Sequence, residues 1–173
     1  MEGSHLEGRT KNKKMVLYLF RHGIAGPATA GQGDAARTLA PEGIDRLKRQ
    51  ARVLERAGFR IDRLLTSPLV RARQTADLLA PALGVSPETD TLLQPGCTFD
   101  DIAELLARYP QAARVMLVGH QPDLGRLART LTGSNAKMRT GMMAVIDVQA
   151  LRPSGGLLLG LYDPEVMARL APA

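Results

Sequence analysis

The alternation of strand-like and helix-like segments constrains this 173-residue chain more than any other feature. Residues 15–20 (MVLYLF) and 114–119 (RVMLVG) are short apolar runs, which predict strands buried on both faces. Residues 41–57 carry apolar side chains at three- and four-residue spacing, so they predict a helix with Pro41 in its first turn and Gly58 at its end. Strands that alternate with helices in this way predict an α/β fold with a mainly parallel sheet.

The remaining segments continue the same order. Further strands are expected near residues 62–67, 88–93, 142–149 and 156–161, and further helices over residues 68–83, 99–109 and 122–131. Ser67 is interpreted as the N-cap of the 68–83 helix, and Thr98 as the N-cap of the next one. The last two strands form a hairpin. We therefore expect a three-layer sandwich with helices on both faces of the sheet.

The first fourteen residues, MEGSHLEGRTKNKK, differ from the rest of the chain. They are polar, have no periodicity, and contain an LEGR stretch that resembles a linker from an expression vector. We interpret residues 1–14 as an expression tail and residues 15–173 as one domain. No apolar run approaches the roughly 20 residues that span a bilayer, and no signal peptide is recognisable. The protein is expected in the cytoplasm, away from membranes.

Charge and cysteine content restrict the possible partners. The formal net charge is +6, of which the tail contributes +2. Without a basic run or an aromatic platform, this excess does not indicate nucleic-acid binding, and an anionic substrate explains part of it. Cys97 is the single cysteine, so an internal disulfide and a cysteine-based zinc cluster are excluded. We expect an idle thiol. No pattern in the sequence defines an oligomeric state.

Chemically active side chains follow the predicted strands. Sheets of this kind bind ligands outside the carboxyl ends of their strands. The strand over residues 15–20 leads into Arg21 and His22, and the strand over 114–119 leads into His120. The strand over 62–67 ends at Ser67, with Arg71 in the first turn of the helix that follows. Both histidines of residues 15–173 and two arginines are therefore expected on one edge of the sheet.

These residue types indicate an anion site. The planar guanidinium of Arg21 matches two phosphate oxygens, and a helix N-terminus such as that near Arg71 attracts anions. Arg71 is favoured over Arg73 because a side chain in the first turn points back toward the strand end. Two histidines without an acidic pair make a poor metal site, and the nucleotide-binding and serine-nucleophile motifs are absent. We expect no metal and no cofactor.

Three motifs in order suggest a family. They are L-F-R-H-G at 19–23, T-S-P-L-V-R-A-R-Q-T-A at 66–76 and V-G-H-Q-P at 118–122. Together they resemble the histidine phosphatase superfamily. The D-x-x-R-x-L pattern at 34–39 before P-E-G is most similar to its short bacterial branch, the SixA phosphohistidine phosphatases. The resemblance extends over residues 15–163 and implies a phosphoglycerate mutase-like fold.

The resemblance also implies roles. His22 would be the nucleophile that forms a phosphohistidine intermediate, and Arg21, Arg71 and His120 would bind the phosphoryl group. Gly23 and Ser67 would assist in binding the substrate. General chemistry agrees, because imidazole nitrogen is a competent neutral nucleophile and cationic donors neutralise the phosphoryl oxygens without a metal.

No general acid can be assigned from the sequence. Many relatives carry an acidic residue that protonates the leaving group, but here Gln94 stands where a glutamate would be convenient. Asp100 and Asp101 lie just beyond and equally suit the first turn of a helix. A phosphoramidate needs such an acid less than an ester does, so we hypothesise a preference for P–N bonds or activated phosphates.

The expected activity is dephosphorylation of phosphohistidine in proteins. The alternatives are a small-molecule phosphomonoesterase on the same fold and a non-catalytic phosphate-binding module. Residues 24–38 are mostly small and are expected to form a mobile edge of the site.

Overall fold

The computed structural model describes residues 14–28, 31 and 33–170. Most of the predicted expression tail, residues 1–13, thus lies outside the described residues. Within the described ranges, none of the helices combines the length and the apolar character that crossing a membrane requires.

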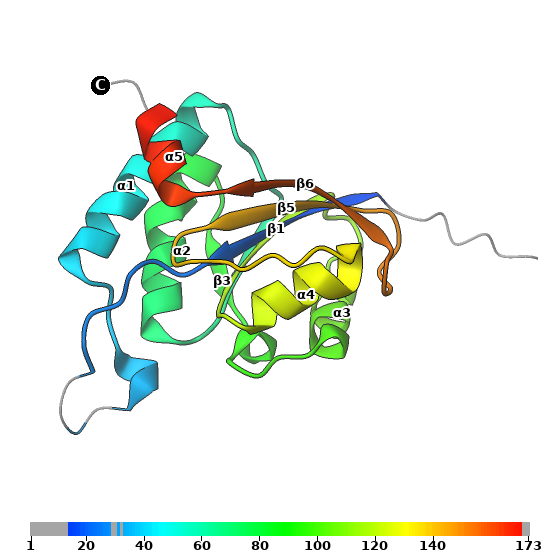
Figure 1. Ribbon diagram of the computed structural model, residues 1–173, viewed down its shortest axis with the longest axis horizontal. Helices are drawn as coiled ribbons and strands as arrows, with labels where there is room; N and C mark the ends of the chain where they lie inside the picture. Colours follow the sequence, from blue (N-terminus) through cyan, green and yellow to red (C-terminus); the bar gives the residue numbers. More distant parts are fainter. Residues whose placement is uncertain (1–13, 29–30, 32, 171–173) are drawn as a thin grey trace, which may run out of the picture.

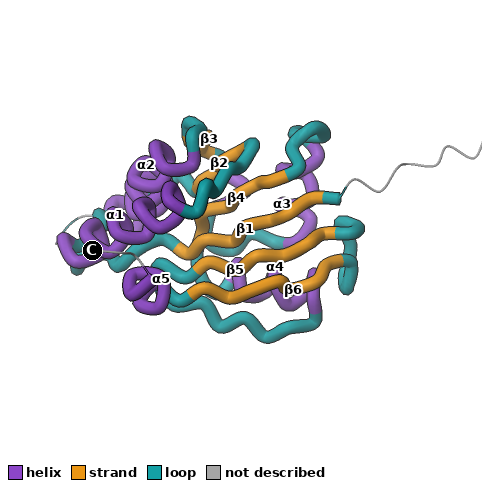
Figure 2. Tube along the Cα trace, turned by 90° about the horizontal axis from the view of Figure 1, so that it is seen from above, coloured by secondary structure: helices purple, strands orange, loops and turns teal. Residues whose placement is uncertain are grey.

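A six-stranded sheet forms the centre of the molecule, in the order β3-β2-β4-β1-β5-β6. The strands are β1 (Met15–Arg21), β2 (Arg63–Thr66), β3 (Pro87–Thr89), β4 (Arg114–Gly119), β5 (Met143–Val148) and β6 (Gly156–Tyr162). The first four pair in parallel, whereas β5 is antiparallel to both β1 and β6. Figure 2 shows β4, β1, β5 and β6 lying side by side. The predicted mainly parallel sheet with a terminal hairpin is confirmed.

Helices cover both faces of this sheet. They are α1 (Pro41–Arg56), α2 (Val70–Leu83), α3 (Phe99–Ala107), α4 (Asp123–Thr132) and α5 (Pro164–Leu170), with short 3₁₀ helices η1 (Asp34–Ala36) and η2 (Thr91–Leu93). Figure 1 shows α1, α2 and α5 on one side and α3 and α4 on the other. The three-layer sandwich expected from the sequence is confirmed.

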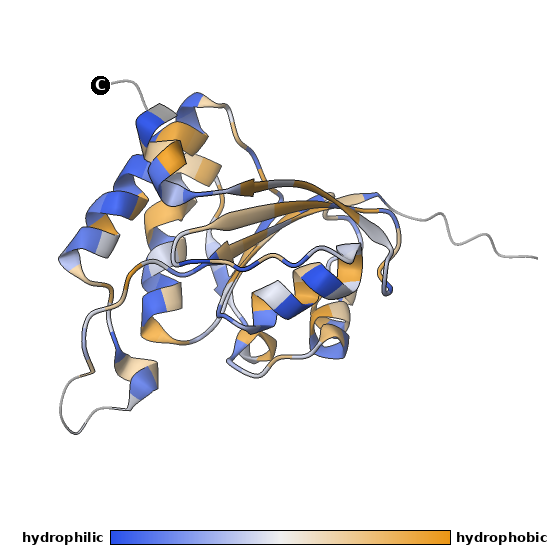
Figure 3. Cartoon of the chain, in the orientation of Figure 1, coloured by the Kyte–Doolittle hydropathy of each residue, from blue (hydrophilic) through white to orange (hydrophobic). Residues whose placement is uncertain are grey.

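The position of β1 between the two helical layers explains why its sequence is apolar throughout. Tyr18 and Phe20 pack into the core beneath α1 and α2, whereas Leu17 and Leu19 pack into the core beneath α3 and α4. A strand in the middle of a three-layer sandwich has no solvent face, so alternation of polar and apolar residues is lost. Figure 3 shows the hydrophobic colour of β5 and β6 against the mixed colours of α1.

The ends of some elements differ from the predictions. The N-cap of α2 is Leu69, so the interpretation of Ser67 as N-cap was wrong. The backbone N–H of Ser67 still donates to Val118 in β4, which prolongs the extended chain and delays the helix. Thr98 caps α3 as predicted, in a reciprocal capping box with Asp101.

One predicted strand is shorter than expected, and one helix was not predicted. The strand expected near 88–93 ends at Thr89 and is followed by η2. The sequence analysis did not include α5, because seven residues are too few to show helical periodicity. This helix lies against α1, and its Met167 is buried in the core on that face.

Candidate active site

A cleft opens at the carboxyl ends of β1 and β4, with a volume of about 410 Å³. It is lined by Arg21, His22, Ile24, Ala25, Asp34, Arg37, Arg71, Pro95, His120, Gln121 and Thr140. The structure therefore brings together the four side chains that the sequence placed on one edge of the sheet. The parallel pairing of β1 with β4 sets Arg21 opposite Gly119, and the residue that follows each of these strands is a histidine. The ring centroids of His22 and His120 are 5.2 Å apart.

His22 is held as a neutral imidazole. Its Nδ1 lies 2.8 Å from the carbonyl oxygen of Gly23, and a carbonyl can only accept, so Nδ1 carries the proton. The lone pair is then on Nε2, which accepts a hydrogen bond from Nε of Arg71 at 3.2 Å. Burial lowers the pKa of His22 to about 4, and the charges of Arg71 and Arg21 act in the same direction. The ring is thus neutral near neutral pH, with an unprotonated Nε2 that is able to act as a nucleophile.

A chain of hydrogen bonds through Gly23 and Thr75 supports His22. The backbone N–H of Gly23 donates to Oγ1 of Thr75 at 3.0 Å, and Thr75 donates to the backbone oxygen of Arg71 at 2.7 Å. A Cβ atom at Gly23 would lie 2.7 Å from Cδ1 of Leu47, which explains the glycine. The sequence analysis did not single out Thr75. Its signal is the four-residue spacing from Arg71, which puts both side chains on one face of α2.

His120 is oriented by Ser67. Its Nε2 lies 2.8 Å from Oγ of Ser67, and that oxygen already accepts from the backbone N–H of Leu69. With the hydroxyl donating to Nε2, the ring proton is on Nδ1, which is buried and has no partner among the described residues. Burial lowers the pKa of His120 to about 3, with smaller contributions from His22 and Arg71. Two buried imidazoles beside two arginines are both disfavoured as cations.

Gly23 and Ser67 do not line the cleft. Gly23 acts on the ring of His22 through its carbonyl, and Ser67 is fully buried with its hydroxyl on His120. Their expected assistance in substrate binding stays a prediction, and in the structure both residues act through the two histidines. The side chains of Leu47 in α1 and of Leu39 lie against Gly23 and separate it from solvent.

The two arginines are anchored differently. One terminal nitrogen of Arg21 donates to the backbone oxygen of Met138 at 2.8 Å, while its Nε is buried and has no partner among the described residues. Burial, followed by the charge of Arg71, lowers the pKa of Arg21. Arg71 is only 6% exposed, so its charge is weakly screened by solvent. The cleft is a concentrated cationic environment suited to an anion.

Asp34 is the functional candidate that the sequence analysis missed. Among the described residues that line the cleft it is the one carboxylate. Its Oδ2 accepts from Arg71 at 2.8 Å and its Oδ1 from Arg37 at 3.1 Å. These hydrogen bonds from Arg71 and Arg37 lower the pKa of Asp34. The D-x-x-R-x-L pattern at 34–39 contains Asp34 and Arg37, but the sequence analysis used this pattern only as evidence of the family resemblance.

The loop over residues 24–38 is tied down where it is described. Ala25 pairs with Leu39 in an isolated antiparallel bridge, and the guanidinium of Arg37 donates twice to the backbone oxygen of Gly26, at 3.0 and 2.9 Å. Residues 29, 30 and 32 lie outside the described residues. These contacts fix the path of the described part of the loop, and its mobility stays a prediction.

The acid candidates from the sequence lie elsewhere. Gln94, Asp100 and Asp101 are not among the residues that line the cleft. Asp101 accepts from the backbone N–H and the hydroxyl of Thr98, so it belongs to the N-terminus of α3. The carboxylate nearest the arginines comes instead from η1.

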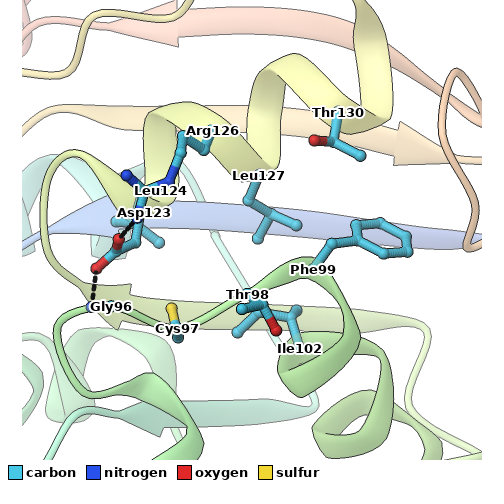
Figure 4. A pocket seen from close by; sticks show the side chains of 10 residues that line it. All are labelled: Gly96, Cys97, Thr98, Phe99, Ile102, Asp123, Leu124, Arg126, Leu127 and Thr130. Carbon is cyan, nitrogen blue, oxygen red and sulfur yellow. Dashed lines mark hydrogen bonds and ion pairs between the residues drawn. The ribbon is translucent and has the colours of Figure 1, made fainter.

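A second cavity, of about 360 Å³, lies between α3 and α4 (Figure 4). Its wall includes Cys97 and Asp123, and Asp123 accepts from the backbone N–H of Gly96 and pairs with Arg126. Burial raises the pKa of Cys97 to about 11, so the thiol stays protonated and is not an activated nucleophile. Within the described ranges, no group of three or more histidine, cysteine, aspartate or glutamate side chains could hold a metal.

Cationic donors beside neutral imidazoles suit a tetrahedral oxyanion. The fold and the cleft together therefore define an α/β protein with an anion site of the kind that suits a phosphoryl group.

Known proteins identify the family. The model of the histidine phosphatase superfamily (branch 1) matches residues 17–115, more than half of the chain. Phosphohistidine phosphatase SixA of Escherichia coli (strain K12) is 30% identical over 123 residues, which are 68% of this chain and 74% of that protein. An uncharacterized protein of Picosynechococcus sp. is 42% identical over 120 residues, 68% of this chain and 73% of its own. The protein belongs to the histidine phosphatase superfamily, in its SixA-like branch.

The solved structures agree with this placement. The structure of the protein histidine phosphatase SixA complexed with tungstate superposes with a TM-score of 0.78 at 26% identity, covering 88% of this chain and 99% of that one. Family and fold support a phosphatase.

Proposed function

We propose that the protein removes phosphoryl groups from phosphohistidine in proteins, through a phosphohistidine intermediate on His22. The observation that carries the proposal is the state of the His22 ring. Its Nδ1 proton is donated to the Gly23 carbonyl, its Nε2 lone pair accepts from Arg71 in the wall of the cleft, and its pKa is lowered to about 4. A neutral, oriented imidazole among cationic donors is what phosphoryl transfer to nitrogen requires.

The reaction takes two steps in this cleft. In the first, Nε2 of His22 attacks phosphorus, the bond to the leaving imidazole breaks, and solvent supplies the proton that the leaving nitrogen takes up. Arg21, Arg71 and His120 neutralise the charge on the phosphoryl oxygens. In the second, water attacks the phosphorus on His22, the P–N bond breaks, and inorganic phosphate leaves. The electrons of the P–N bond return to Nε2, so His22 is neutral again with its proton on Nδ1, and the protons of the attacking water stay on phosphate or pass to solvent.

The surroundings of the cleft support a P–N substrate. Asp34 is the one carboxylate among the described lining residues, and its ion pairs keep it ionised near neutral pH. An ionised carboxylate cannot protonate a poor alkoxide leaving group, whereas an imidazole leaves with less help. The E. coli relative is a phosphohistidine phosphatase, which supports the same class of substrate.

Substrate profiling tests the proposal. Wild type should have a much higher kcat/KM on a phosphohistidine protein than on an alkyl phosphate monoester, with para-nitrophenyl phosphate between them. Acid-labile phosphate should be trapped on wild type and be absent from His22→Ala, which should keep its affinity for inorganic phosphate. Arg73→Ala serves as the control, because Arg73 lies in the same helix as Arg71 but is exposed. This variant should keep the activity of wild type. Equal kcat/KM on the alkyl monoester would contradict the preference for P–N bonds.

The second candidate is a small-molecule phosphomonoesterase. Asp34 favours it, because a carboxylate beside Arg71 could serve as an acid if the bound substrate raised its pKa. Efficient turnover of alkyl monoesters that disappears in Asp34→Asn would support this candidate. A non-catalytic phosphate-binding module would instead bind phosphate, show no turnover and form no phosphoenzyme.

A further inference from the structure

Each of the three guanidinium nitrogens of Arg71 donates a hydrogen bond to a group of the protein itself. Its Nε donates to Nε2 of His22 at 3.2 Å. One terminal nitrogen donates to the backbone oxygen of Asp34 at 2.7 Å, and the other donates to the Asp34 carboxylate at 2.8 Å. All three nitrogens of this planar cation thus donate to the protein, and one of them pairs with a carboxylate.

A phosphoryl group would need the same nitrogens. A guanidinium binds oxyanions through two parallel N–H groups, and it binds a carboxylate in the same way. At Arg71 the backbone oxygen and one carboxylate oxygen of Asp34 therefore take the two positions that phosphoryl oxygens would take. An incoming phosphate must exchange with it or lie beside it, and two anions at that separation repel each other.

The nucleophile is engaged in the same arrangement. While Arg71 donates to His22 Nε2, the lone pair that would attack phosphorus is directed at Arg71. Asp34 holds the other end of the guanidinium and so stabilises this position. Movement of Arg71 toward a phosphoryl group would release the lone pair and break the contact with Asp34.

We propose that Asp34 is an internal competitor for Arg71, which sets how tightly the cleft holds phosphoryl groups. The inference rests on the proposed function, since it concerns the same cleft. A phosphoryl group carries two or more charged oxygens and can contact Arg21 and Arg71 together, whereas Asp34 contacts Arg71 and Arg37. Substrate can therefore displace Asp34, and the returning carboxylate weakens the hold on the phosphate product. Asp34 acts here as a positioning residue.

The test is the affinity of Asp34→Asn for inorganic phosphate, measured by titration calorimetry. Loss of the competing charge should tighten phosphate binding about threefold to tenfold, the range expected for a half-exposed charged contact. KM should fall with it, and kcat should not rise, because product leaves more slowly. Asp34 is mostly exposed, so the variant is expected to fold, and Asp34→Ala provides a second reading.

Two further variants serve as controls. Glu104→Gln removes the same charge from an exposed ion pair with Arg108 that is not part of the cleft, and its phosphate affinity should equal that of wild type. Asp34→Glu keeps the negative charge and should bind phosphate nearly as wild type does.

The outcomes separate the hypotheses. Unchanged or weaker phosphate binding in both Asp34→Asn and Asp34→Ala would overturn the inference, since a merely structural role predicts weakening. A loss of kcat on alkyl phosphates without tighter phosphate binding would assign an acid role to Asp34 and would also overturn it. Failure of wild type to form a phosphoenzyme would instead refute the proposed function, while the phosphate titrations would still report on the contact.

Discussion

The two buried histidines should make the stability of the fold depend on pH between 5.5 and 7.5. The pKa of His22 is lowered from 6.5 to about 4 and that of His120 from 6.5 to about 3, in both cases mainly by burial. As the pH falls through 6.5, the unfolded chain takes up a proton on each ring, whereas the folded protein does not. Because the unfolded state then binds more protons, acidification favours unfolding.

The magnitude follows from the number of protons. Each ring contributes about 1.4 kcal/mol per pH unit once the unfolded state is protonated and the folded state is not. Integrated from pH 7.5 to 5.5, two rings lower the free energy of unfolding by about 3 kcal/mol, a large fraction of the roughly 5–15 kcal/mol typical of a domain. The carboxylates with lowered pKa values, such as Asp34, titrate below this window and do not obscure the effect.

Urea denaturation at pH 5.5, 6.5 and 7.5, without phosphate in the buffer, measures this dependence. The unfolding midpoint of wild type should fall steadily toward pH 5.5. The double variant His22→Gln, His120→Gln should show a nearly flat profile over the same range. A change below about 1 kcal/mol in wild type, or an equal slope in the double variant, would refute the reasoning that burial keeps both rings neutral.

Two substitutions behind the cleft test its support. In Gly43→Ala, the new Cβ would lie 2.3 Å from the backbone oxygen of Ile24, so α1 must move away from the loop over residues 24–38. Urea denaturation should show that the free energy of unfolding falls by about 1–3 kcal/mol. Unchanged stability would contradict this close approach. In Thr75→Val, the buried N–H of Gly23 loses its acceptor, so the free energy of unfolding should fall by about 1–3 kcal/mol, and kcat should fall as well. An unaltered kcat would show that the orientation of the His22 ring does not depend on Thr75.

Much of the fold was predictable because its signals are local. The apolar run of β1, the helical spacing of α1 and the capping residue of α3 each depend on neighbours within a few residues. The N-cap of α2 was misplaced for the opposite reason. Ser67 remains extended because its backbone bonds to Val118 in another strand, a contact that no local pattern records.

By itself, the sequence determined the α/β sandwich and the meeting of Arg21, His22, Arg71 and His120, because parallel strands bring their carboxyl ends to one edge. Only the tertiary structure decided the roles of Thr75 and Asp34. Asp34 lies 37 positions before Arg71, and packing of the η1 segment against α2 joins them. The protonation of the two imidazoles was decided in the same way, because burial by distant segments, and not the residue type, sets their pKa values.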